Sequence, residues 1–423
     1  MLGRMKIQPH APTPSPVAPP PGPPAPASPV DSFQPSGEGG SLPDLARAAG
    51  LFRGGADQVW SSEARGALSE PRVAADGTIL VGAFDHRIYG LDPATGRTRW
   101  SHKTASHLDD PPAAGPDGRL YATSRDLHLH ILSPSGSPLA RVEAGPTTSG
   151  PVVDGQGRVF LGTIHGEAKA FDPDGKPLWS RKLEDPHEPG YMVSPVLGPD
   201  GTVYFTASGG TLTAMDPASG EPRWTVKHGS GLYAESVVGP DGRLYVPYLD
   251  GNLRCLEPAT GQVAWTARTG GGLSSSPVVR GDRLWALAEG GRLSCHRLSD
   301  GAVQWKADVG GERREAPPIP GPDGTLFVGD GGSDLLALDE ATGAEKWRVR
   351  LDGPAGKGVM SPDGATVFLA VGRQGMVAVS SRSLARRVEE AAARPEGPAP
   401  RIQEEPAHVD IGGVRLPRRT PGN

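Results

Sequence analysis

Four acidic residues stand at comparable places in the chain, each just before a short apolar run: Glu70, Asp110, Glu235 and Glu315. Gathered on one surface, carboxylates attract cations and basic peptides and repel anions. Lys357 stands at a further place of this kind, and Asp109 adds a charge beside Asp110. If the fold brings these places together, they form an acidic binding site; the alternative is that they only solvate a rim.

A second candidate site is the segment LEDPHEPGYM, from Leu183 to Met192, which contains Asp185, His187 and Glu188. An imidazole and two carboxylates can hold a metal ion, but zinc sites have recognisable ligand spacings and this segment has none. A solvated loop is the alternative that we favour, and we predict no metal site. The sequence also lacks a nucleophile with a paired base and a phosphate-binding glycine loop.

The elements that position these residues follow from a repeat. LDPATGRTRW ends at Trp100, and similar segments end at Trp179, Trp224, Trp265, Trp305 and Trp347. With Trp60 and a degenerate copy in which Ala140 replaces the tryptophan, the successive spacings are 39 to 45 residues. This is the length of a propeller blade of four short strands.

Each unit has the turn signals of a four-stranded antiparallel meander. Asp-Gly turns, such as GPDG at 198–201, separate apolar runs, and the second run alternates like a half-buried strand. Eight third strands can be counted, but the last unit lacks its fourth strand. The segment that ends at Trp60 supplies this strand and closes the ring, which removes an open sheet edge. We therefore predict an all-β, eight-bladed propeller over residues 54–384.

The motif Asp-x-x-x-Gly-x-x-x-Trp, found at Asp92, Gly96 and Trp100 and repeated along the chain, resembles that of PQQ-repeat (quinoprotein-like) propellers. The resemblance covers about 330 residues. It implies that each tryptophan packs between neighbouring blades, and the structural docking residues are then Trp60, Trp100, Trp179, Trp224, Trp265, Trp305 and Trp347.

The resemblance leaves function open, because the family contains quinone-dependent dehydrogenases as well as a scaffold for outer-membrane protein assembly. Dehydrogenases of the family use a disulfide between adjacent cysteines and Ca²⁺ held by Glu and Asn. The only cysteines here are Cys255 and Cys295, at equivalent places in adjacent blades, where we expect buried free thiols. The sequence therefore supports neither PQQ nor Ca²⁺, and no catalytic residue can be assigned.

The ends of the chain differ from the ring in composition. Residues 1–50 are rich in proline and predict a disordered arm, and residues 385–423 predict a short helix followed by a disordered tail. The net charge is −5, with Lys and Arg scattered, which argues against nucleic acid as a partner. No apolar run is long enough to span a membrane, and no signal peptide or lipidation cysteine is visible, so we expect a cytoplasmic protein.

These observations predict a monomeric, non-catalytic binding or scaffolding propeller that engages a protein or peptide through its acidic, longer-loop face. The alternative is a divergent PQQ-dependent oxidoreductase.

Overall fold

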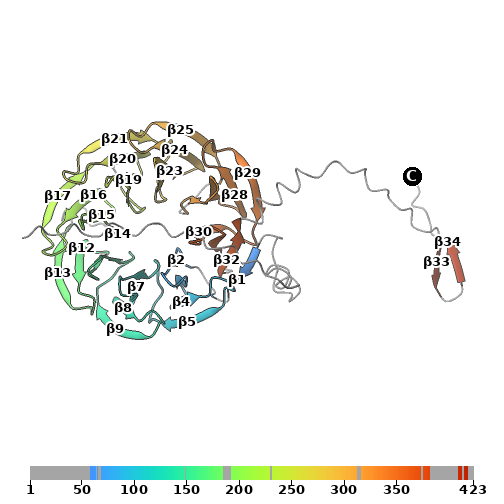
Figure 1. The fold of residues 1–423 in the computed structure, drawn as a ribbon, viewed down its shortest axis with the longest axis horizontal. Coiled ribbons are helices and arrows are strands. Elements are labelled where there is room, and N and C mark those ends of the chain that lie inside the picture. Colours follow the sequence, from blue (N-terminus) through green and yellow to red (C-terminus); the bar gives the residue numbers. More distant parts are fainter. Residues whose placement is uncertain are drawn as a thin grey trace, which may run out of the picture. The chain divides into compact units, whose positions relative to one another are not determined.

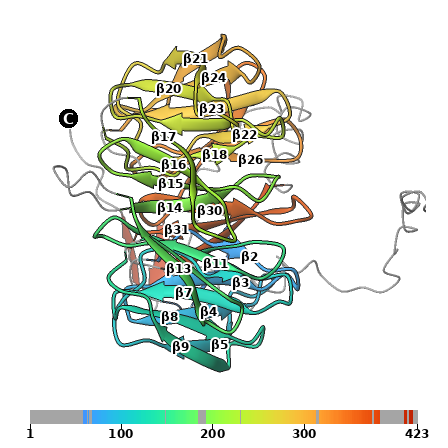
Figure 2. The same ribbon diagram turned by 90° about the vertical axis from the view of Figure 1, so that its left-hand side faces the viewer.

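The computed structural model describes residues 58–62, 64, 68–147, 149–183, 192–228, 231–311, 316–372, 375–381, 408–411 and 414–417. Eight antiparallel sheets of four strands each form the blades of a ring (Figure 1). In each blade the first strand lies innermost and the fourth outermost, and Figure 2 shows the ring from its side. The predicted eight-bladed propeller is confirmed.

The first four blades follow one another along the chain. Blade 1 has β2 (Arg72–Val73), β3 (Ile79–Ala83), β4 (Arg87–Leu91) and β5 (Thr98–Lys103). Blade 2 has β6 (Ala113–Ala114), β7 (Leu120–Ser124), β8 (His128–Leu132) and β9 (Pro138–Glu143). Blade 3 has β10 (Val152–Val153), β11 (Val159–Gly162), β12 (Glu167–Phe171) and β13 (Pro177–Lys182). Blade 4 has β14 (Met192–Leu197), β15 (Val203–Ala207), β16 (Thr211–Met215) and β17 (Pro222–Lys227).

The remaining blades complete the ring. Blade 5 has β18 (Val237–Val238), β19 (Leu244–Pro247), β20 (Asn252–Leu256) and β21 (Val263–Arg268). Blade 6 has β22 (Val278–Arg280), β23 (Arg283–Ala288), β24 (Arg292–Arg297) and β25 (Val303–Asp308). Blade 7 has β26 (Ile319–Pro320), β27 (Thr325–Gly329), β28 (Asp334–Asp339) and β29 (Glu345–Arg350). Blade 8 has β30 (Ala355–Met360), β31 (Thr366–Val371), β32 (Gly375–Ser380) and, from the start of the ring, β1 (Gln58–Ser61).

Blade 8 is closed by the N-terminal strand, as the repeat count predicts. β1 pairs antiparallel with β32, and Trp60 lies opposite Ala378. The indole of Trp60 also stacks on Phe368 of β31, with 5.7 Å between the ring centroids. The ring is therefore held shut by strand pairing and by apolar packing between segments more than 300 residues apart in sequence.

The second strands are more buried than the sequence alternation predicts. All five residues of β15 (VYFTA) are buried, and those of β3 and β7 are buried too. A blade in a ring has a neighbour on each side, so both faces of its inner strands lose water. The outermost strand β5 instead alternates between partly buried and exposed positions.

The repeated tryptophan packs six of the blades against the next one. The indole of Trp179 is 8% exposed, and its Nε1 donates a 3.1 Å hydrogen bond to the carbonyl of Pro217 in blade 4. A Cβ atom on Gly220, which has φ +68°, would lie 2.5 Å from this indole. The same contact joins Trp60 to Gly96, Trp100 to Gly136, Trp224 to Gly261, Trp265 to Gly301 and Trp305 to Gly343. The tryptophan and the turn glycine are thus two halves of one contact between blades.

Blade 2 lacks the tryptophan, and apolar side chains of its own fill the space. At Gly175 of blade 3, a Cβ atom would come within 2.5 Å of Val142 and 2.9 Å of Ile131. Ala140, at the tryptophan position, is partly buried and packs with this cluster.

Two predicted segments lie outside the described residues: the proline-rich arm (1–50) and the short helix after residue 384. Within the predicted disordered tail, the structure describes a hairpin of β33 (His408–Ile411) and β34 (Val414–Pro417), in which Ile411 lies opposite Val414.

Candidate binding face

One face of the ring carries the loop that leads into the first strand of each blade together with the turns between second and third strands. Backbone hydrogen bonds join these two kinds of segment: the amide of Leu108 donates to the carbonyl of Ala83, and that of Leu232 to the carbonyl of Ser208. We call this the leading face. The turns between strands one and two and between strands three and four lie on the other face, because strand direction alternates in a meander.

Three predicted carboxylates lie at the leading face, just before the innermost strands of their blades, and we call the region between them the channel. Glu70, Asp110 and Glu235 are partly buried and come from blades 1, 2 and 5. Burial raises the pKa of Asp110 to about 6, and the negative charge of Glu235 adds to this shift. Burial also raises the pKa of Glu70, against the opposing effect of Lys357. Residues far apart in sequence therefore share one electrostatic site.

Polar groups of the ring orient two of these carboxylates. Ser194 Oγ lies 3.4 Å from Asp110 Oδ2 and accepts a 3.2 Å hydrogen bond from the amide of Gly150. Lys357 Nζ lies 3.8 Å from Glu70 Oε2. The positive charges of Lys357 and Arg72 both act on Glu70 and Asp110. Among the described residues, two cations therefore face three carboxylates, and the site remains acidic when all three are ionised.

The other predicted acidic residues behave differently or cannot be placed. Asp109 forms a bidentate ion pair with Arg125, at 2.7 and 3.0 Å, so its charge is compensated. Glu315, Asp185, His187 and Glu188 lie outside the described residues. Among the residues that the structure describes, no group of three or more His, Cys, Asp or Glu could hold a metal ion.

Exposed apolar side chains on the leading face were missed by the sequence analysis. Phe84 is 48% exposed, Leu127 44%, Ile164 38% and Tyr233 57%. The first three lie in turns between second and third strands of blades 1, 2 and 3, and Tyr233 precedes Glu235 by two residues. The signal was present, since apolar residues interrupt otherwise polar turns such as AFDHR and RDLH.

Two of these turns hold strained residues. Immediately before the third strand, blades 3 to 6 place a glycine with positive φ: Gly166, Gly210, Gly251 and Gly291. At the equivalent position blade 1 has His86 (φ 69°) and blade 2 has Leu127 (φ 73°). A left-handed backbone is unfavourable for a bulky L-residue, and such strain is commonly found at functional sites.

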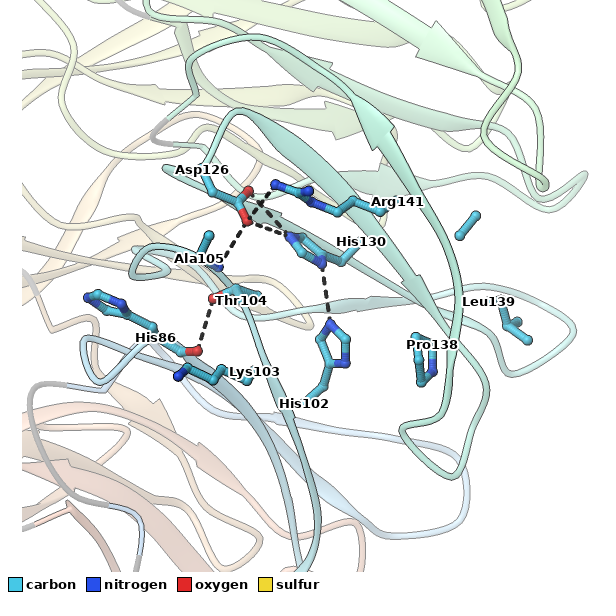
Figure 3. A pocket seen from close by; sticks show the side chains of 11 residues that line it. His86, His102, Lys103, Thr104, Ala105, Asp126, His130, Pro138, Leu139 and Arg141 are labelled. Carbon is cyan, nitrogen blue, oxygen red and sulfur yellow. Dashed lines mark hydrogen bonds and ion pairs between the residues drawn. The ribbon is translucent and has the colours of Figure 1, made fainter.

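A cluster of histidines lies in an open groove of 740 Å³ between blades 1 and 2 (Figure 3). His130 Nε2 lies 3.0 Å from Asp126 Oδ2, and His130 Nδ1 lies 3.3 Å from Nε2 of His102, which comes from β5. The side chains of Asp126 and His130 are each 4% exposed. Burial lowers the pKa of both histidines, which favours their neutral forms.

The two cysteines are buried and unpaired, as expected. Burial raises the pKa of Cys255 to about 12 and that of Cys295 to about 11. Neither thiol is therefore a reactive group at neutral pH.

The comparisons with known proteins agree with the fold. A family model, PQQ_2, described as "Outer membrane protein assembly factor BamB", matches residues 52–133, 116–235, 208–312 and 289–400. These matches together cover most of the chain. The chain belongs to this PQQ-repeat family.

Individual relatives of this PQQ-repeat propeller are more distant. It is 32% identical over 112 residues to the outer membrane protein assembly factor BamB of Nitrosomonas eutropha, covering 26% of each chain. It is 30% identical over 181 residues to the protein Rv3035 of Mycobacterium tuberculosis, covering 37% of this chain and 42% of the relative. The chain thus spans less than half the length of these curated relatives. The crystal structure of BamB from Moraxella catarrhalis matches with a TM-score of 0.63 at 17% identity, and the match covers 76% of this chain and 96% of that chain. This likeness shows the shared fold.

The expectation of a cytoplasmic location is wrong. Three relatives are named as factors that assemble proteins of the outer membrane, and this membrane lies outside the cytoplasm. The lack of a recognisable export signal in the sequence is no indication of where the protein is located. In the described part of the chain, no helix is long and apolar enough to cross a membrane.

Proposed function

We propose that this propeller is a non-catalytic scaffold that binds an extended, basic segment of a partner protein on its leading face. Its relatives named as outer membrane protein assembly factors suggest that the partner takes part in that assembly. The observation that carries the proposal is the pairing of an acidic channel with exposed apolar side chains on one face.

The two parts of the face would act differently. The carboxylates of Glu70, Asp110 and Glu235 would attract Lys and Arg side chains and speed the encounter. Phe84, Leu127 and Tyr233 would supply the apolar contacts, because aromatic and aliphatic anchors provide most of the binding energy of protein interfaces. Phe84 already packs on His107, with ring centroids 4.8 Å apart, so this anchor is held in place before binding.

Photo-crosslinking in the cells that produce the protein tests this proposal. A photoreactive amino acid at Phe84 or Tyr233 should capture one protein from the outer-membrane assembly machinery. The matched control is Ser219, which lies in a turn between third and fourth strands on the other face and donates to Asp216. Equal capture of the same protein from Ser219 would show that the leading face is not the binding surface.

Neutralising the three channel carboxylates tests their part in binding. The triple variant Glu70→Gln, Asp110→Asn, Glu235→Gln should reduce binding of a Lys-rich peptide with alternating apolar residues by at least tenfold at low salt. The control is a set of variants of Asp92, Asp216 and Asp339, which lie at the connections between third and fourth strands on the other face. If the triple variant binds this peptide as the wild type does, the channel carboxylates have no part in recognition.

A further inference from the structure

The groove between blades 1 and 2 has no role in the proposed function, yet its side chains are arranged in a specific way. It is lined by β5 and the residues after it from blade 1, and by β8 and β9 from blade 2. His102 points from β5 toward His130 on β8 (Figure 3). The two imidazoles therefore meet across the boundary between two blades.

The distance between the two facing nitrogens suits a shared ligand. His102 Nε2 and His130 Nδ1 are 3.3 Å apart. Two imidazole nitrogens bound to one tetrahedral metal ion at about 2.05 Å are separated by about 3.3 to 3.4 Å. Rotation of the partly exposed His102 ring would point both lone pairs at one ion.

Asp126 holds His130 in the tautomer that a metal ion requires. Its buried carboxylate accepts a hydrogen bond from His130 Nε2 and another, of 3.1 Å, from the amide of Ala105. Because the proton resides on Nε2, the lone pair of His130 lies on Nδ1 and faces His102. A carboxylate bound to the far nitrogen of a ligating histidine is the usual outer-shell arrangement of metal sites.

We propose that His102 and His130 bind a first-row transition-metal dication, such as Zn²⁺ or Ni²⁺, with Asp126 as the positioning residue. Imidazole is a preferred ligand of these ions. Water or a partner side chain would occupy the remaining positions, which the open groove leaves accessible. The ion would link the outer strand of blade 1 to blade 2. This inference does not depend on the proposed function.

Titration of the full, untagged and chelator-treated chain with Ni²⁺ or Zn²⁺ tests it, by calorimetry and by thermal unfolding. The wild type should bind one equivalent of ion with a rise in Tm of a few degrees, since an ion that binds only the folded state stabilises it. His102→Ala and His130→Ala should abolish both effects. His165→Ala, which removes an exposed histidine in a turn of blade 3, should change neither.

A second set of variants separates ligation from folding. Asp126→Asn should weaken metal affinity about 10- to 100-fold, as losing an outer-shell carboxylate does elsewhere. His102→Gln keeps a polar side chain in the open groove and should fold. When Co²⁺ is used as a spectroscopic probe in place of Zn²⁺, this variant should lack the visible absorption that the wild type shows with bound Co²⁺. Binding that survives in His102→Gln and His130→Ala, or the lack of saturable binding in the wild type at submillimolar metal, would overturn the proposal.

Discussion

Trp179 and Gly220 lie in neighbouring blades and are in direct contact, the indole resting on a turn whose left-handed backbone leaves no room for a Cβ atom. The indole also donates to the Pro217 carbonyl in the same turn. This pairing recurs around the ring and explains why the chain repeats an Asp-x-x-x-Gly-x-x-x-Trp motif. The glycine is required twice, once for its φ and once for the space it leaves.

Trp179→Ala should lower the free energy of unfolding by about 3 to 5 kcal/mol, because it leaves a cavity and an unpaired carbonyl between blades. Urea unfolding followed by far-UV circular dichroism measures this loss. Leu178→Ala is the matched control, since Leu178 is the preceding residue of β13 and is largely exposed. A loss below about 1 kcal/mol for Trp179→Ala would contradict the packing role.

Leu127→Gly should stabilise the protein by about 0.5 to 1 kcal/mol, because it relieves a left-handed leucine and restores the residue that four other blades use. The same change should weaken partner binding, since it removes an exposed apolar anchor. Leu127→Asn, which tolerates the same φ, is expected to be stabilising by a smaller amount. A loss of stability in both variants would mean that the exposed leucine contributes to folding.

The channel should make stability depend on pH through Asp110. Its folded pKa of about 6 lies above its ordinary value of 3.8, so its protonation favours the folded state. This contribution is fully present below about pH 3.8 and is lost as the pH rises through about 6. Glu235, Lys357, Arg72 and the Gly150 amide all act on this carboxyl.

The variant Asp110→Asn isolates this effect from general acid denaturation. The Tm of the variant minus that of the wild type should be larger at pH 7.5 than at pH 4.5, because only the wild type has to bury a charge at the higher pH. Differential scanning fluorimetry across this range measures the difference. A constant difference in Tm between the two proteins at all pH values would show that Asp110 does not titrate with a raised pKa.

Titration with PQQ, with and without Ca²⁺, should change neither the Tm nor the absorbance of the cofactor. The acidic channel repels a tricarboxylate, and the two cysteines are far from adjacent in sequence. Saturable binding with a gain in Tm at micromolar PQQ would instead favour an oxidoreductase, and dye-linked alcohol oxidation would be the assay to follow.

The sequence by itself determined the architecture, because blade formation depends on local signals. Turn glycines, Asp-Gly pairs and a tryptophan every 39 to 45 residues each act within one unit, and their repetition predicts the ring and its closure by the strand at Trp60. The same repetition predicts that Glu70, Asp110 and Glu235 stand at equivalent positions of the ring, since equivalent positions share a radius; their role as a binding site stays a prediction.

The tertiary structure decided which side chains of neighbouring units meet. His102 and His130 are 28 residues apart on different blades, and nothing in their spacing predicts a 3.3 Å contact. Asp109 and Asp110 are adjacent in sequence, yet Asp109 is paired with Arg125 and Asp110 is partly buried beside Ser194. Burial and charge compensation depend on the distance and direction between side chains of separate strands, and these are set only when the blades pack.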